Sequence, residues 1–246
     1  MPRHPKAQSP KRRGGLPAAR RSAADQLSRE LKDALDRQAA TAEILRIISR
    51  SPSDSQPVFD AIVQSGLKLF GGAAVFVALP DGGMVRAAAF AELDPARAEA
   101  WRRRFPFPLT REYMHSIAIL DARVVDVPDV ANAPADIAVG AQNFLASGYR
   151  AITIMPMLRG SAAIGALSVV RLLPGPLSPE QIAVLKTFAE QAVIAIENSR
   201  LLNELRARTE ELRQLNEQLE KRVSDQVAEI ERMGGCGASC RRRSRT

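Results

Sequence analysis

Cysteine, histidine and aromatic side chains are scarce in this 246-residue chain, and their positions restrict what it can do. Both cysteines, Cys236 and Cys240, lie near the C-terminus, so we expect neither a disulfide nor a cysteine metal site in the folded core. His4 lies in a basic N-terminal segment, which leaves His115 as the single histidine available to a domain. The sequence therefore predicts no metal site and no catalytic thiol.

Long hydrophobic runs are also lacking. No run approaches the ~20 apolar residues of a membrane-spanning helix, and no apolar segment follows the early basic residues, as a secretory signal would require. We therefore expect a cytoplasmic protein that does not bind a membrane.

The net charge of +8 is concentrated in two tails. Residues 1–22 carry seven Lys or Arg and no acid, and residues 234–246 carry four Arg, so subtracting these eleven charges leaves −3 for residues 23–233. We expect residues 1–21 to form a disordered basic tail. The alternative, attraction to nucleic acid or acidic membranes, is weakened because no aromatic residues are interleaved with the charges. No specific nucleic-acid partner is predicted.

Between the tails, the periodicity alternates between helix and strand. Residues 22–50 form an amphipathic helix whose heptad seam we assign to Leu27, Leu31, Ala34, Gln38, Thr41, Leu45 and Ile48. Residues 51–200 form the domain. After a helix that ends at Gly71-Gly72, strands are predicted at 74–79, 84–90, 124–127, 150–157 and 161–171, with helices at 94–104, 110–120 and 137–147. This order predicts an α+β fold, in which terminal helices cover one face of an antiparallel sheet and a helical insertion covers the other.

Residues 178–233 are predicted to form one helix. Ser178, with Pro179 next and Gln181 three residues later, is a strong helix-start signal. Residues 201–233 continue as a heptad-patterned stalk, in which four extra residues between Leu219 and Val223 form a stutter. A helix this long needs a partner helix, so we expect a parallel homodimer through the N- and C-terminal helices. The stutter either permits two registers or belongs to a static spacer.

Three sequence motifs, which follow one another along the chain in the right order, resemble those of the GAF domain, a sensory module related to PAS domains. They are a strand motif at 118–130, a hairpin motif at 150–171 with Ile164-Gly165-Ala166-Leu167, and a closing-helix motif that starts at Leu177-Ser178-Pro179. The resemblance covers about residues 44–200. It implies the GAF-like antiparallel sheet flanked by helices, with a small-molecule cavity between the sheet and the insertion.

Residues 212–233 resemble the linker that precedes the catalytic domain in GAF-containing class III adenylate/guanylate cyclases. After Met233, residues 234–246 change abruptly to a Gly-, Cys- and Arg-rich tail, which we expect to be disordered. One permitted choice of codons, read in a shifted frame, resembles the start of a cyclase domain, so a frameshift after Met233 is our hypothesis. The function implied is a regulatory module without enzyme activity, whose output domain is missing. The alternatives are a sensor fragment of a two-component histidine kinase and a stand-alone dimerisation module without ligand.

The cofactor stays unknown. The resemblance implies no covalent chromophore, because no cysteine lies in the domain, and the Asn-Lys-Phe-Asp-Glu signature of cyclic-nucleotide-binding members is absent. Arg102-Arg103-Arg104 beside Trp101 suggests either an anion site or, more commonly, an exposed helix face. The candidate residues of the ligand cavity, each of which could equally be a core or solvated side chain, are Phe76, Arg86, Tyr113, His115, Asp126, Phe144 and Arg150.

Overall fold

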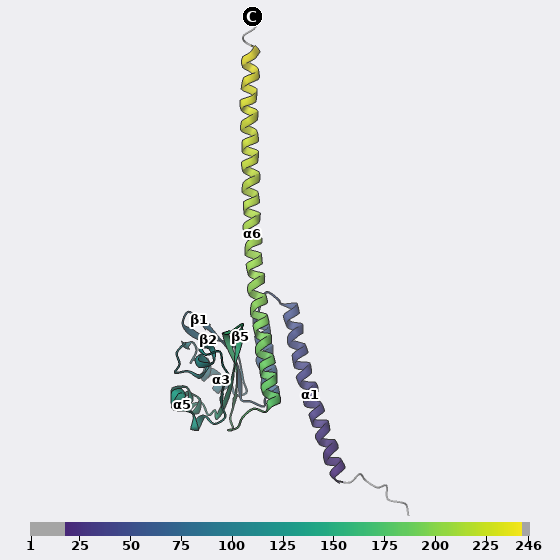
Figure 1. The fold of residues 1–246 in the computed structure, drawn as a ribbon, viewed down its shortest axis with the longest axis vertical. Helices are drawn as coiled ribbons and strands as arrows, with labels where there is room; N and C mark the ends of the chain where they lie inside the picture. Colours follow the sequence, from purple (N-terminus) through teal and green to yellow (C-terminus); the bar gives the residue numbers. More distant parts are fainter. Residues whose placement is uncertain (1–17, 243–246) are drawn as a thin grey trace, which may run out of the picture.

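The computed structural model describes the backbone of residues 18–242 and the side chains of residues 25–232 (Figure 1). The helical insertion is the segment of residues 93–150, and it contains two short 3-10 turns, Val130–Asn132 and Ala135–Ile137. The other elements, in chain order, are α1 (Ala18–Arg50), α2 (Gln56–Leu69), β1 (Ala74–Asp81), β2 (Met84–Glu92), α3 (Pro95–Arg102), β3 (Phe107–Pro108), α4 (Met114–Leu120), β4 (Val125–Val127), α5 (Ala138–Ala146), β5 (Ala151–Arg159), β6 (Ala162–Arg171) and α6 (Pro179–Arg242).

The strands form one antiparallel sheet in the order β3-β2-β1-β6-β5-β4. Two hairpins, β1–β2 and β5–β6, meet in the middle, where Val75 lies opposite Val169. Residues 151–157 of β5 are buried without alternation, as expected of a strand covered on both faces. The predicted α+β class is confirmed.

Each face of the sheet has its own hydrophobic core, because successive side chains of a strand point to opposite faces. Phe76 and Ala78 of β1 belong to a core shared with α3, α4 and α5. Val75 and Val77 belong to the other core, which is shared with α1, α2 and α6. In Figure 1, α1 and α6 accordingly lie on one side of the sheet, and α3 and α5 lie on the other.

Helix α6 begins with the reciprocal cap that its sequence predicts. Ser178 Oγ accepts a hydrogen bond from the Gln181 backbone N–H at 3.2 Å, and Gln181 Oε1 accepts one from the Ser178 N–H at 2.9 Å. The first turns are anchored by Leu185 and Phe188, both fully buried against the sheet. The helix comprises 64 residues, which at ~1.5 Å per residue is roughly 95 Å. Figure 1 shows it projecting far beyond the domain.

The structure divides the predicted seam of α1 between two environments. Ile48 is buried on α2 and α6, whereas Leu27, Leu31 and Leu45 stay exposed. Ile44, which the predicted seam omitted, is fully buried. The sequence-based expectation of one apolar stripe therefore differs from the structure, because this helix has one apolar face toward its own domain and a second apolar face toward solvent.

The helix ends also differ from the sequence-based expectations. Helix α1 begins at Ala18 rather than residue 22, and α6 continues past Met233 to Arg242, into the segment expected to be disordered. Glycine costs about 1 kcal/mol per residue in a helix interior relative to alanine, which disfavours the helix without forbidding it. Residues 1–17 and 243–246 of the predicted tails lie outside the described residues. Among the described helices, none has an apolar stretch long enough to cross a bilayer.

The burial of Ile44 can be tested by truncation. Ile44→Ala removes a fully buried side chain from the α1–α2–α6 core and should lower the free energy of unfolding by about 2–5 kcal/mol. Glu43→Ala, at an adjacent exposed position, should change it by less than about 1 kcal/mol. Urea unfolding followed by circular dichroism measures both. Equal losses would show that α1 is not docked on the domain.

Candidate functional site

A cavity of about 250 Å³ lies within the helical insertion, on the face of the sheet opposite α6. Side chains from α3, α4, α5 and the segment around β3 form its walls. The lining residues are Trp101, Arg104, Phe107, Tyr113, Met114, His115, Gly140, Asn143 and Phe144. The volume equals that of about eight water molecules, which suits a small ligand.

Aromatic rings make most of this wall. The ring centroids of Trp101 and Phe144 are 4.8 Å apart, and those of Phe107 and Tyr113 are 4.7 Å apart. The His115 ring stacks on Phe144 with centroids 6.2 Å apart. These separations are typical of packed aromatic pairs. Mutually packed aromatic rings therefore present an apolar surface to the cavity.

His115 is held as a neutral group. Its Nε2 atom lies 2.9 Å from Ser168 Oγ of β6, and the side chain is almost completely buried. Because burial disfavours the charged imidazolium, the pKa of His115 is lowered from 6.5 to about 4. At neutral pH this residue adds polarity to the cavity without adding charge.

Arg104 is the one lining residue with a permanent positive charge. Its guanidinium carbon lies 4.9 Å from the centre of the Trp101 ring, and Nη1 donates a hydrogen bond to the Asn143 backbone oxygen at 2.6 Å. The adjacent Arg102 and Arg103 are exposed and pair with Glu99. Of these three arginines only Arg104, two residues after the end of α3 at Arg102, lines the cavity.

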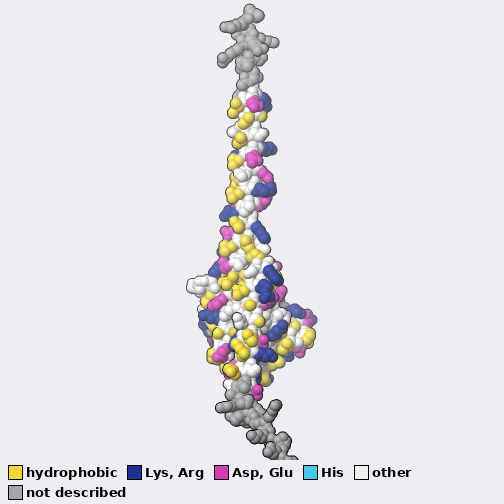
Figure 2. Space-filling model, turned by 90° about the vertical axis from the view of Figure 1, so that its right-hand side faces the viewer, with side chains coloured by type: hydrophobic (Ala, Val, Ile, Leu, Met, Phe, Trp, Pro, Cys, Tyr) yellow, Lys and Arg dark blue, Asp and Glu magenta, His cyan; other side chains and the backbone are white. Residues whose placement is uncertain are grey.

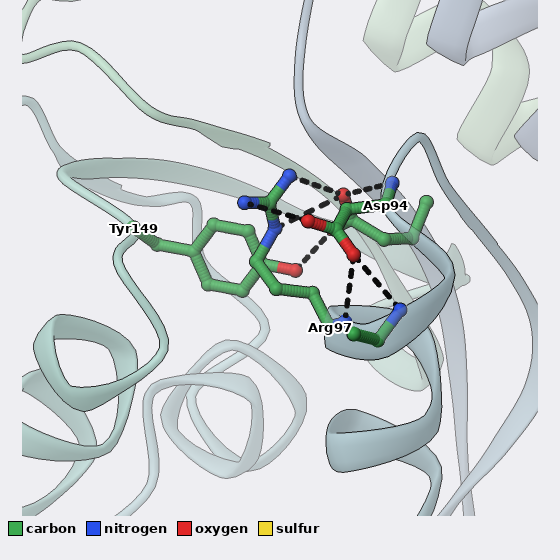
Figure 3. Close-up of polar contacts among 5 residues, drawn as sticks. Asp94, Arg97 and Tyr149 are labelled. Atoms are coloured by element: carbon green, nitrogen blue, oxygen red, sulfur yellow. Dashed lines mark hydrogen bonds and ion pairs between the residues drawn. The ribbon is translucent and has the colours of Figure 1, made fainter.

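A polar network fixes α3, and with it Trp101, against the sheet (Figure 3). Glu92 of β2 has a fully buried carboxylate that accepts hydrogen bonds from the Tyr149 hydroxyl and from Arg97 Nη2, the latter at 3.0 Å. Asp94 caps α3 by accepting from the backbone N–H groups of Ala96 and Arg97. These backbone bonds lower the pKa of Asp94, and burial together with Glu92 raises the pKa of Tyr149. The network orients one wall of the cavity.

The structure brings together three of the seven residues that the sequence suggested. Tyr113, His115 and Phe144 all line the cavity. Phe76 lies behind it in the core, with its ring centroid 6.1 Å from that of His115.

Arg86, Asp126 and Arg150 do not line the cavity. Arg86 is exposed on β2, and its Nε atom lies 3.8 Å from Asp81 Oδ2. Asp126 accepts a hydrogen bond from Thr153 at 2.7 Å on strands β4 and β5, where the neighbouring Val125 and Val127 face the cavity side instead. Arg150 is exposed and binds through its backbone to Val130 and Arg171.

Sequence reasoning missed Trp101, Arg104, Phe107, Met114, Gly140 and Asn143 as lining residues. Trp101 and the arginine run were noted, but the spacing gave no sign that Arg104 turns inward. Gly140 packs closely on the preceding loop, because a Cβ atom there would lie 3.3 Å from the Glu112 backbone oxygen, which is tighter than most Cβ contacts. Such contacts between distant segments leave no local sequence signal.

A larger hollow of about 740 Å³ lies between α1, the end of α2 and the start of α6. Charged surface side chains line much of it, including Glu30, Asp33, Asp36, Arg37 and Lys68. It is the open gap where α1 diverges from α6, so we assign the candidate site to the aromatic cavity. Over the described residues, no group of three or more His, Cys, Asp or Glu is arranged to hold a metal ion.

The GAF domain family model matches residues 54–196. This range covers more than half of the chain and contains both sheet faces and the aromatic cavity. The chain belongs to the GAF family, whose members are mostly regulatory, ligand-binding domains.

Solved structures agree with this fold. The chain is similar to a free methionine-R-sulfoxide reductase from Neisseria meningitidis (20% identity, TM-score 0.55, covering 70% of this chain and 93% of that one). It is also similar to the GAF domain of a phosphoenolpyruvate-protein phosphotransferase from Coxiella burnetii (13%, 0.55, 70% and 98%) and to a methyl-accepting chemotaxis protein (21%, 0.52, 66% and 98%). At these identities the likeness establishes the fold alone. A comparison with curated proteins gave no match.

The buried His115 predicts a specific acid sensitivity. Its pKa is about 4 in the folded state and about 6.5 in the unfolded state, so the unfolded state binds more protons between these values. His115 therefore leaves the free energy of unfolding unchanged above about pH 6.5. Below that value it lowers this free energy, by roughly 3 kcal/mol when the pH has fallen to about 4.

Urea unfolding at pH 7.5 and 4.5 measures this loss. His115→Gln should show a smaller fall in stability between the two pH values than the unchanged protein. His4→Gln should keep the full fall, because the effect is assigned to His115 alone. A His115→Gln variant with an unchanged pH dependence would contradict the assignment.

The Glu92 network predicts a difference between the two tyrosines. Tyr149→Phe removes a donor from a buried carboxylate and should cost about 1–3 kcal/mol of unfolding free energy. Tyr113→Phe removes a hydroxyl that makes no hydrogen bond to the described residues and should cost less than about 0.5 kcal/mol. Thermal and urea unfolding compare the two variants, and equal costs would show that the network does not hold α3.

Proposed function

We propose that this chain is a signalling GAF module that senses a small molecule in the aromatic cavity and transmits the change through α6 to an effector. One observation carries the proposal: α6 is at once part of the domain core and the start of the projecting rod. Leu185, Phe188 and Ala192 pack under the sheet, and the same helix continues without a break into solvent.

The projecting part of α6 carries an apolar stripe that its own domain does not cover. Figure 2 shows these hydrophobic side chains in a row along the rod. Each of them is about half exposed or more, and together they are Leu201, Leu205, Leu212, Leu215, Leu219, Val223, Val227 and Ile230. Burying one Leu, Ile or Val side chain contributes about 1.5–3 kcal/mol. Covering the stripe in a coiled coil would therefore stabilise the rod substantially.

A homodimer is the partner arrangement that we propose. Helix α1 offers a second apolar stripe on its solvent side, formed by Leu27, Leu31, Leu35 and Leu45. The rod carries mixed charges in i,i+3 and i,i+4 ion pairs, such as Arg213 with Glu210 and Glu217. Two copies side by side would bury both stripes and leave these charged faces in water. The N- and C-terminal helices then form one parallel bundle.

The stutter between Leu219 and Val223 is our proposal for the switching element. Two coiled-coil registers of similar energy would let a ligand in the cavity bias the rod by a small displacement of α6. In a protein that carries its effector, deletion of residues 220–223 should abolish or invert regulation. Regulation that survives the deletion unchanged would make the stalk a static spacer.

The effector class rests on resemblance. A class III nucleotide cyclase is our first proposal, because residues 212–233 resemble the linker of such enzymes, and a two-component histidine kinase is the alternative. Residues 201–232 contain no histidine that could accept a phosphoryl group, which favours the cyclase. The module itself is proposed to be cytoplasmic and non-enzymatic.

Translation of the DNA that follows residue 233 in all three frames tests both the parentage and the frameshift, since cyclase metal-site aspartates should appear in one frame.

The dimer can be tested by a matched pair of substitutions. Leu215→Glu places a charge on the apolar stripe, whereas Gln214→Glu places the same charge one residue away, outside it. We expect sedimentation equilibrium to show a dimer at micromolar concentration, weakened roughly a hundredfold by Leu215→Glu and little changed by Gln214→Glu. A monomeric unchanged protein would overturn the proposed dimer and the transmission that depends on it.

A further inference from the structure

We propose that the aromatic cavity binds a small aromatic carboxylate, with its ring between the aromatic walls and its carboxylate on Arg104. This inference rests on the proposed sensory function and adds the chemical class of the ligand. The classes to be distinguished are neutral aromatics, aromatic cations, aromatic anions and small anions without a ring.

The charge balance of the wall favours an anion. No Asp or Glu is among the lining residues, His115 is neutral, and Arg104 is the one charged side chain. Among the described residues, Arg104 has no carboxylate within ion-pair distance, whereas its neighbours Arg102 and Arg103 both pair with Glu99. A ligand carboxylate would supply the negative charge that no described side chain provides to Arg104.

The same geometry argues against a cationic ligand. A cage of aromatic rings commonly binds quaternary ammonium groups through cation–π contacts. Here the Arg104 guanidinium already lies 4.9 Å from the centre of the Trp101 ring. A second cation in the cavity would be repelled by Arg104 and would find no lining acid to offset the repulsion.

The volume and the aromatic walls of the cavity set the size and the kind of ligand that we propose. Trp101 and Phe144 form one part of the wall, and Phe107 and Tyr113 form another, with centroid separations of 4.8 and 4.7 Å within each pair. A volume of about 250 Å³ suits one aromatic ring with a short side chain. Free Arg104 donors remain for the carboxylate, because Nη1 is the only guanidinium nitrogen bonded within the described part of the chain. Phenylacetate and benzoate have this form.

Titration with matched small probes tests the ligand class. Trp101 is the only tryptophan of the chain, so its fluorescence reports on the cavity directly, and isothermal titration calorimetry gives an independent affinity. Phenylacetate and benzoate are compared with benzyl alcohol, benzylamine and acetate at about 150 mM salt, where non-specific attraction is screened. We expect an aromatic carboxylate to bind at least tenfold more tightly than benzyl alcohol, and acetate and benzylamine to show no saturable binding.

Two substitutions at one position assign the role of Arg104. Arg104→Gln should weaken phenylacetate binding at least tenfold and leave benzyl alcohol unchanged, whereas Arg104→Lys should keep most of the preference for the carboxylate. Arg103→Gln, at an exposed neighbour that pairs with Glu99, should change neither affinity. Thermal unfolding of each variant checks that the domain is intact.

Equal affinity for phenylacetate and benzyl alcohol, or preference for benzylamine, would overturn the ligand class and leave the sensory proposal standing. Failure of all five probes to bind would likewise overturn the aromatic carboxylate. The dimer is measured by sedimentation without these probes, so failure of the proposed function would be seen separately.

Discussion

The continuity of α6 is the constraint on which the rest of the molecule depends. The first turns belong to the domain core through Leu185 and Phe188, and the later turns expose an apolar stripe from Leu201 onward. A helix cannot bend sharply without breaking its i to i−4 hydrogen bonds. In the function that we propose, a displacement at the sheet is therefore carried along the rod, and a partner helix covers the exposed stripe.

The sheet links the cavity to that helix by the alternation of its strands. Ser168 of β6 meets His115 on the cavity side, while its neighbours Leu167 and Val169 face the core that contains α6. Strand β6 is thus the one element that separates His115 from the core that contains the start of α6. With His115 neutral, Arg104 is the one charged side chain that lines the cavity.

The candidate site could be predicted only in part. The resemblance to the GAF family predicted a ligand cavity between the sheet and the insertion, whereas the cavity in the structure lies within the insertion. Tyr113, His115 and Phe144 of the predicted residues line it, and their role in ligand binding stays a prediction. Arg86 and Asp126 were misplaced because a strand residue faces one side or the other by register alone. Arg104 was not selected because its direction depends on where α3 ends and on a contact with Asn143.

The sequence by itself determined the order of helices and strands, the α+β class and the start of α6 at its Ser178–Gln181 cap, since periodicity and capping are local properties. Only the tertiary structure decided that Ile44 rather than Leu45 enters the core, and that one arginine of three turns inward. Those outcomes depend on contacts between segments far apart in the chain, and no local pattern encodes them.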